Sequence, residues 1–316
     1  MRSLFRSILL QPRMKSSLAT RRAHFSPYLL ALVFVCICLA PVRTLAQGAS
    51  PLELGRRIVP DVLGIVLGPN FNYATGTFDT GCPCTFAGGF GIGPTVGLLY
   101  EKNLFSPSPQ WRLGTVNFGA RLLYEQRNIA SAFLEYERVP VESLVQRGQS
   151  FIVPILFRHL AEASFSMLTL TPYLAWSPFT QAQGLLQSLY FQGGVQVGYV
   201  LSSRIRHTKI VEQPTVRLPN GEVSQVEIIT DSLGTGGLRR VVQDTPVDSV
   251  NAVQLGLSLA AGAEIPLGKE GGRFRLSPFV QYIFPLTNMS EAGRDFRIGS
   301  LQVLLTLKMN LQDASN

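Results

Sequence analysis

Two cysteines separated by a single proline, Cys82 and Cys84, form the most conspicuous local motif of the chain. This spacing fits three kinds of chemistry: a disulfide, one part of a metal site, or a contact with a partner. A disulfide across one residue is strained, because the bond needs Cα atoms roughly 4.4–6.8 Å apart. A metal site needs further ligands, and no histidine lies nearby in the sequence. We interpret the pair as a loop-tightening element or a loop disulfide, and we expect no metal site.

Charged side chains within alternating polar and apolar segments form a second candidate group. Their sequence parity places them all on the polar face of those segments. If that face lines a narrow barrel, the charges would pair and plug it, because an unpaired buried charge is costly. A gated ion pathway through the same charges is the alternative. The expected lumen network consists of Glu101, Arg121, Glu125, Glu264, Arg273, Arg275 and Lys308.

Other chemistry-bearing patterns are weak. His159 and His207 are isolated in the sequence, which is typical of surface or hydrogen-bonded histidines. The Gly91–Gly93 and Gly234–Gly236 spacings do not occur between a strand and a helix, so they predict no nucleotide loop. No Ser/His/Asp spacing indicates a catalytic triad. We expect no catalytic residue, no cofactor and no enzymatic activity.

The elements that would position these groups are strands. From Leu301 to Leu311 apolar and polar residues alternate, with Leu304 as the only exception, so this segment has one apolar and one polar face. Similar segments recur between Gly, Pro, Asn and Ser clusters, and no stretch after residue 50 has sustained helical periodicity. The expected strands are about 62–73, 90–101, 113–125, 166–176, 189–201, 253–267, 274–286 and 301–311.

This alternation fits both a membrane barrel and a soluble ligand-binding barrel, which differ in whether the apolar face points outward. Aromatic residues at the ends of the apolar face are typical of girdles at membrane interfaces. The polar face is rich in Gly, Gln, Ser and Thr, which suits a narrow packed lumen. We predict an all-β fold, an eight-stranded antiparallel transmembrane β-barrel, with a soluble periplasmic barrel as the alternative. The girdle residues are Tyr73, Phe90, Tyr100, Tyr124, Trp176, Tyr199 and Phe284.

The connections between these strands support a count of eight, because every long connection then falls on the same side of the membrane. Segments 133–139 and 151–158 also have strand-like patterns, and counting them as membrane strands would give ten. We interpret them as a hairpin that extends the third and fourth strands beyond the membrane. Segment 216–229, around a Pro-Asn-Gly turn, is expected to form another outer hairpin.

The N-terminus has the pattern of a secretion signal. Basic residues precede an uncharged run of 13 residues, Tyr28 to Ala40, which is shorter than the roughly 20 needed for a membrane-spanning helix. We predict a signal peptide over 1–46 cleaved after Ala46, a lead-in over 47–60 and a barrel over 61–312. Residues 1–46 hold seven of the 28 Lys and Arg and none of the 20 Asp and Glu, leaving a net charge of about +1. We therefore expect no nucleic-acid partner.

Several short segments resemble outer-membrane β-barrel domain proteins of the Bacteroidota and Chlorobi type, a group that includes PorT-like barrels. The resemblance covers most of residues 60–311 and implies an eight-stranded barrel in the bacterial outer membrane, with no single activity attached to the family. The chain departs from the proteobacterial pattern because it has no terminal aromatic residue. The matching segments are 157–164, 168–174, 198–203, 262–267 and 285–287.

These observations predict an outer-membrane protein with a structural or surface-interaction role, such as envelope integrity, adhesion or assistance to secretion. A narrow channel through the lumen charges is the alternative. The expected partners are outer-membrane lipid, the barrel-assembly machinery and a surface or envelope protein. That protein would contact the outer loops, around Cys82 and over 202–251.

Overall fold

The computed structural model describes residues 61–80, 84–106, 114–142, 149–179, 184–229, 236–268 and 273–311. They belong to one compact unit that starts at Ile58. The predicted signal peptide and lead-in lie outside the described residues, so both stay predictions. Within the described residues, no helix is long and apolar enough to cross a membrane.

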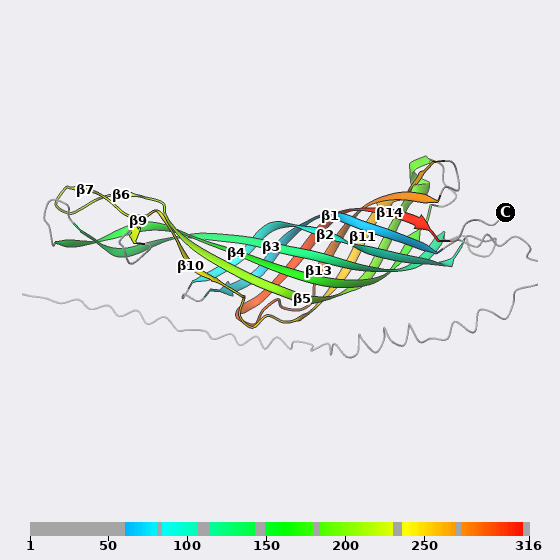
Figure 1. Ribbon diagram of the computed structural model, residues 1–316, viewed down its shortest axis with the longest axis horizontal. Helices are drawn as coiled ribbons and strands as arrows, with labels where there is room; N and C mark the ends of the chain where they lie inside the picture. Colours follow the sequence, from blue (N-terminus) through cyan, green and yellow to red (C-terminus); the bar gives the residue numbers. More distant parts are fainter. Residues whose placement is uncertain are drawn as a thin grey trace, which may run out of the picture. The chain divides into compact units, whose positions relative to one another are not determined.

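Eight long strands form a closed antiparallel ring (Figure 1). The ring runs in the order β5, β11, β13, β14, β1, β2, β3 and β4, and pairing between β4 and β5 completes it. Closure gives each of the eight strands a hydrogen-bonded neighbour on both sides within the barrel, as a hydrocarbon environment requires. The predicted eight-stranded barrel is confirmed, and the ten-stranded alternative is wrong. The strands are β1 (Val62–Asp79), β2 (Thr85–Phe105), β3 (Thr115–Glu142), β4 (Ser150–Ser177), β5 (Leu189–Val211), β11 (Val253–Ala263), β13 (Phe274–Pro285) and β14 (Gly293–Asn310).

Several shorter elements lie in the connections between the strands of the ring. The strand expected over 253–267 is interrupted at Glu264, after which β12 (Ile265–Leu267) pairs with the start of β13. A short 3-10 helix, η2 (Gly184–Ser188), precedes β5. The outer hairpin expected over 216–229 is present as β6 (Thr215–Arg217) paired with β7 (Val223–Gln225). Two further short strands, β8 (Ile228–Ile229) and β9 (Gly236–Gly237), pair with each other.

The apolar face of each strand points outward, as predicted for a membrane barrel. On β1 the outward side chains Leu63, Ile65 and Leu67 are 42%, 52% and 53% exposed, whereas the inward Asn70 and Asn72 are fully buried. This inside-out arrangement matches lipid outside and a polar lumen, and it contradicts the soluble alternative. The outward apolar side chains form an apolar band, which we define by residues 62–73, 90–101, 116–125, 167–176, 190–201, 253–263, 274–286 and 299–310.

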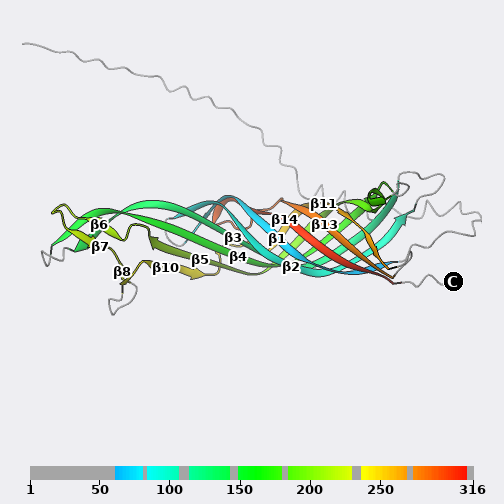
Figure 2. The same ribbon diagram turned by 90° about the horizontal axis from the view of Figure 1, so that it is seen from above.

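Three strands continue well past this band (Figures 1 and 2). The β3–β4 pairing runs without interruption to Glu142 and Ser150, and β5 continues beside β4 to Val211. Strand β10 (Arg239–Thr245) pairs with the outer part of β5. It takes the same edge of β5 that β11 occupies within the apolar band. We call 126–142, 150–166, 202–211 and β10 the outer extension. The hairpin expected from 133–139 and 151–158 is confirmed as part of it.

A small apolar core stabilises the tip of the outer extension. Leu218 and Val226, from the β6–β7 hairpin and its flank, are buried against Ile155 and Phe157 of β4. The hairpin turn is closed by hydrogen bonds between Leu218 and Glu222 and from Gly221 back to Leu218. Because this core is built from side chains of separate segments, the extension is a folded element in its own right.

The position of the apolar band predicts where a charge is tolerated. Leu67→Arg, in the middle of the band, should lower the free energy of unfolding by about 2–4 kcal/mol because it places a cation in hydrocarbon. Ala132→Arg is the matched control, since Ala132 points outward from β3 in the outer extension; its effect should stay within about 0.5 kcal/mol. Urea titration of the barrel refolded in lipid vesicles measures both. Equal losses of stability in the two variants would contradict the assigned position of the apolar band.

Candidate functional site

The inner end of the lumen holds a network of alternating charges. Nζ of Lys308 lies 2.7 Å from Oε2 of Glu101 and 2.6 Å from Oε1 of Glu264. Arg275 extends the chain through Nη1, 3.1 Å from Oε2 of Glu264. The hydroxyl of Tyr173 donates to Oε1 of Glu101 over 2.6 Å. This network thus connects side chains from four strands, β2, β4, β13 and β14. Its fifth contributor, Glu264, lies between β11 and β12.

Arg121 occupies the next level of the lumen and is fully buried. Its guanidinium donates to Oε1 of Gln281 at 2.5 Å and to Oε1 of Gln192 at 2.6 Å. It also lies over the rings of Tyr173 and Phe279, 4.3 and 4.8 Å from their centroids. No carboxylate within ion-pair distance of Arg121 occurs among the described side chains, so amide oxygens and aromatic faces stabilise this cation.

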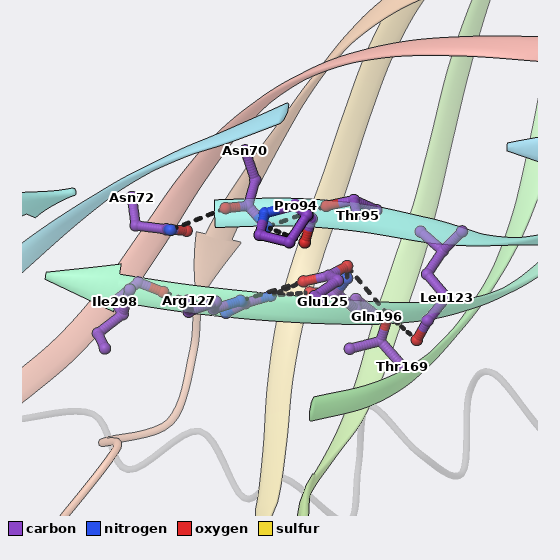
Figure 3. Close-up of polar contacts among 10 residues, drawn as sticks. All are labelled: Asn70, Asn72, Pro94, Thr95, Leu123, Glu125, Arg127, Thr169, Gln196 and Ile298. Atoms are coloured by element: carbon purple, nitrogen blue, oxygen red, sulfur yellow. Dashed lines mark hydrogen bonds and ion pairs between the residues drawn. The ribbon is translucent and has the colours of Figure 1, made fainter. Parts of the chain in front are cut away.

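A second ion pair lies nearer the outer end (Figure 3). Nη2 of Arg127 is 2.9 Å from Oε2 of Glu125, and both side chains are buried. Gln196 donates to Glu125 over 2.8 Å and accepts from Arg127 over 2.7 Å, while Thr169 donates to Glu125 over 3.0 Å. Arg127 was missed because the third strand was expected to end at Glu125. Its parity relative to Glu125 would have identified it.

Small residues make room for this network. Gly119 faces the lumen, and a Cβ added there would lie 2.3 Å from the ring of Tyr173. On the neighbouring strands β1 and β2, Asn70 donates to Thr95 over 2.9 Å, and Asn72 donates to Asn70 over 2.8 Å (Figure 3). Gly119 therefore makes room for the large side chain of Tyr173, its partner on the neighbouring strand, in the narrow interior.

The lumen is filled, and an apolar plug lies above the polar network. At the level of Arg121, the neighbouring Gln281 and Gln302 also have no exposed surface. Toward the outer mouth, buried apolar side chains replace polar ones. We define this apolar plug by Ala74, Phe78, Phe86, Ile129, Ala161, Ala163, Phe165, Met167, Ile205, Met289, Phe296 and Ile298. The arrangement fits a structural plug and does not favour an ion pathway.

Of the seven charges expected in the lumen, six lie in these clusters. Arg273 does not, because it precedes the first residue of β13, where the barrel opens; its side chain is exposed, and no ion pair involves it in the described part of the chain. Leu304, the exception in the alternation of the last strand, points inward and packs in an apolar cluster with Val66, Leu99 and Phe279.

A third cluster lies at the outer mouth and contains the two histidines expected to be isolated. Nδ1 of His159 is 3.0 Å from Nε2 of His207, and both rings are buried. Nε2 of His159 is 3.2 Å from Oε1 of Glu137, whose other oxygen binds Lys209. The topology of β4 and β5 brings these residues together over 48 positions in sequence, which no local spacing could reveal.

His207 belongs to the outer extension, beyond the apolar band. Burial lowers the pKa of its imidazole to about 4, and the nearby His159 and Lys209 act in the same direction. His207 is therefore neutral at physiological pH and can offer a ring nitrogen as an acceptor or ligand. Oγ1 of Thr80 lies 3.3 Å from its Nδ1.

Cys84 borders the same cluster. Its Sγ lies 3.9 Å from Nδ1 of His159. The sulfur is part of a disulfide, and the other cysteines of the chain, Cys82 among them, lie outside the described residues. The pairing of Cys82 with Cys84 therefore stays a prediction.

Comparison with known proteins gives structural likeness alone. No protein-family model matches the chain, and no curated protein matches it. Ail of Yersinia pestis, solved with the heparin analogue sucrose octasulfate, is similar with 10% identity and a TM-score of 0.29, over 79% of this chain and 99% of that chain. Neisserial surface protein A has 10% identity and a TM-score of 0.25, over 79% and 97%. The translocator domain of NalP from Neisseria meningitidis has 10% identity and a TM-score of 0.22, over 90% and 98%.

These similarities are low, so the strand pairing described above carries the assignment of the fold. The PorT-like type suggested by the sequence stays a prediction.

The central position of Lys308 makes it the most sensitive residue of the inner network. Lys308→Met should destabilise the barrel by about 3–5 kcal/mol, because two carboxylates would then lie in the lumen without their shared cation. Adding Glu101→Gln to Lys308→Met should recover part of the loss, because it removes one of those charges. Urea unfolding of the refolded barrel provides the measurement. Arg273→Met, at the same end but exposed, should change stability by less than about 0.5 kcal/mol. A Lys308 variant as stable as the parent would contradict the pairing.

Proposed function

We propose that this chain is a bacterial outer-membrane protein whose barrel anchors the outer extension, and that the extension binds a protein partner at the envelope surface. The observation that carries this proposal is the uninterrupted β3–β4 pairing beyond the apolar band. At about 3.3 Å per residue, the 17 residues from Gln126 to Glu142 are long enough for a contour of roughly 55 Å. The lumen network and plug serve as the internal support of the anchor.

The outer extension carries large apolar side chains that the membrane does not explain. Leu134, Tyr136 and Ile152 are 60%, 65% and 72% exposed, and all three lie beyond the level where the outward residues become polar. Tyr136 pairs with Leu156 and Ile152 pairs with Pro140, so they share the outward face of one hairpin. Exposed apolar and aromatic side chains grouped on one folded surface are typical of protein interaction sites.

The location follows from the predicted signal peptide together with the closed barrel. A chain that is exported across the inner membrane and folds into a barrel with an apolar outer face suits insertion into the outer membrane. Lipid of that membrane and the barrel-assembly machinery are then its first partners. Adhesion, envelope integrity and assistance to secretion all fall within this role. That the chain is not an enzyme stays a prediction.

The orientation of the barrel can be tested with single cysteines in a background that has Cys82→Ser and Cys84→Ser. Asn220→Cys, in the exposed outer hairpin, should react with a membrane-impermeant maleimide on intact cells. Leu186→Cys, exposed in η2 at the opposite end, should react only after the outer membrane is permeabilised. A band in the outer-membrane fraction whose mobility shifts on boiling identifies the folded barrel. Labelling of Leu186→Cys, but not of Asn220→Cys, on intact cells would show that the barrel has the opposite orientation.

Partner binding can be tested by placing a photo-crosslinking phenylalanine analogue at Tyr136 in cells that make the full-length chain. We expect a protein adduct at this position, and we expect Leu134→Lys to weaken it several-fold. The same analogue at Tyr100, which is 37% exposed within the apolar band, is the control and should give no protein adduct. Labelling at both positions, or at neither, would contradict a protein-binding surface on the extension.

A further inference from the structure

The histidine pair at the outer mouth and the neighbouring sulfur share the geometry of a metal site. One donor atom from each of Cys84, His159 and His207 lies within 4.8 Å of the other two. In a tetrahedral zinc site, bond lengths of about 2.0 Å to nitrogen and 2.3 Å to sulfur place ligand atoms about 3.3–3.6 Å apart. The observed separations, 3.0 Å between the two nitrogens and 3.9 Å between nitrogen and sulfur, lie on either side of that range.

Glu137 and Thr80 contact the ring nitrogens of the two histidines that face away from the cluster, and they orient the rings. A carboxylate at Nε2 of His159, supplied by Glu137, selects the tautomer in which Nδ1 carries a free lone pair toward the cluster. Thr80 occupies the same role at Nδ1 of His207, leaving Nε2 directed at His159. Metal-bound histidines in proteins are oriented in this way by a partner on the other nitrogen.

The ring positions are also held by packing. His159 stacks on Phe133 with centroids 4.8 Å apart and planes inclined by 3°, and Phe86 meets His207 edge to face at 5.3 Å. Both histidines are therefore oriented before any ligand arrives, which reduces the entropy lost on binding.

We propose that Cys84, His159 and His207 form a redox-controlled site for Zn²⁺ or a metal of similar softness. While Cys84 is in its disulfide, only the two histidines can coordinate, and binding is weak. A dithiol reductant supplies two electrons and two protons and is itself oxidised to a disulfide, while the S–S bond at Cys84 breaks to give two thiols. The Cys84 thiol then releases its proton as the sulfur–metal bond forms. Water occupies the fourth position.

The bound ion would connect three residues that are far apart in the sequence. Cys84 directly precedes β2, whereas His159 and His207 lie on β4 and β5 in the outer extension. Coordination would join the β1–β2 connection to the extension above the apolar plug. Metal binding is thus expected to raise the temperature of unfolding of the reduced protein, because the folded state alone presents the three ligands together.

A second, competing donor group lies on the far side of His159 and consists of Glu135, Glu137 and His159. It contains carboxylates without sulfur, and Glu137 already binds Lys209. A metal held there would be insensitive to reduction and would not need Cys84. The two sites share His159 but can be separated by substitutions at their other members.

The test uses the full-length protein purified in detergent and shown to be folded by its boiling-dependent shift in mobility. Samples with and without reductant, desalted under inert gas, receive Zn²⁺, and bound metal is counted by mass spectrometry. Co²⁺ reports thiolate coordination through its absorption spectrum. We expect one Zn²⁺ per reduced chain, a thiolate–cobalt band, and much weaker binding without reduction. Ca²⁺ should not compete, since hard cations prefer oxygen ligands.

Variants decide between the two donor groups. His207→Gln and Cys84→Ser should each reduce Zn²⁺ to background while the mobility shift shows that the barrel still folds. Thr80→Val should weaken binding roughly 10–100-fold, the effect expected of a group that orients a ligand. Glu135→Gln is the matched control and should leave binding unchanged. Binding that survives Cys84→Ser and is lost with Glu135→Gln would overturn the proposal, as would the absence of binding by the reduced, folded protein.

Discussion

The pairing between β1 and β14, the first and last strands of the ring, is the constraint on which the whole molecule depends, because it turns a meander of consecutive strands into a ring. In hydrocarbon, an unpaired backbone amide or carbonyl has no water to bind, so a sheet with free edges is not an option. In this pairing Val62, at the start of β1, lies opposite Asn310, at the end of β14. Pairs so distant in sequence form only after the rest of the chain is arranged. Closure therefore couples every strand to every other.

Closing the ring with eight strands leaves an interior that must be filled by side chains. The chain fills it in levels, with ion pairs at the inner end, Arg121 among amides and aromatic rings in the middle, and an apolar plug at the outer mouth. Each of these buried cations contacts polar groups from more than one segment of the chain. A polar interior of this kind gains little stability over an apolar one, but it sets the register, since a slip by one residue would turn the charges toward lipid.

The sequence was sufficient to predict the class of fold and the side of each strand. Period-two alternation identified eight strands, and parity placed Glu101, Arg121 and Lys308 inside. It was not sufficient to predict strand length, because alternation continues past the point where the outward residues become polar. It also failed where a contact joins residues that are far apart in the sequence. His159 and His207 meet because β4 and β5 are neighbours in the ring, and neither residue carries a local signal of that contact.

The outer extension leaves β3 with an unusual edge. Pairing between β2 and β3 ends at Ala130, and no strand partner is described on that side from Ser131 to Glu142. A bare edge in water is a template on which an identical strand from another molecule could add. Here it carries Glu135, Glu137 and Arg138, followed by Pro140, which has no amide hydrogen to offer. A strand added at this edge would have to accommodate charged side chains and would miss a hydrogen bond at Pro140, so the edge is a poor template for pairing between neighbouring barrels.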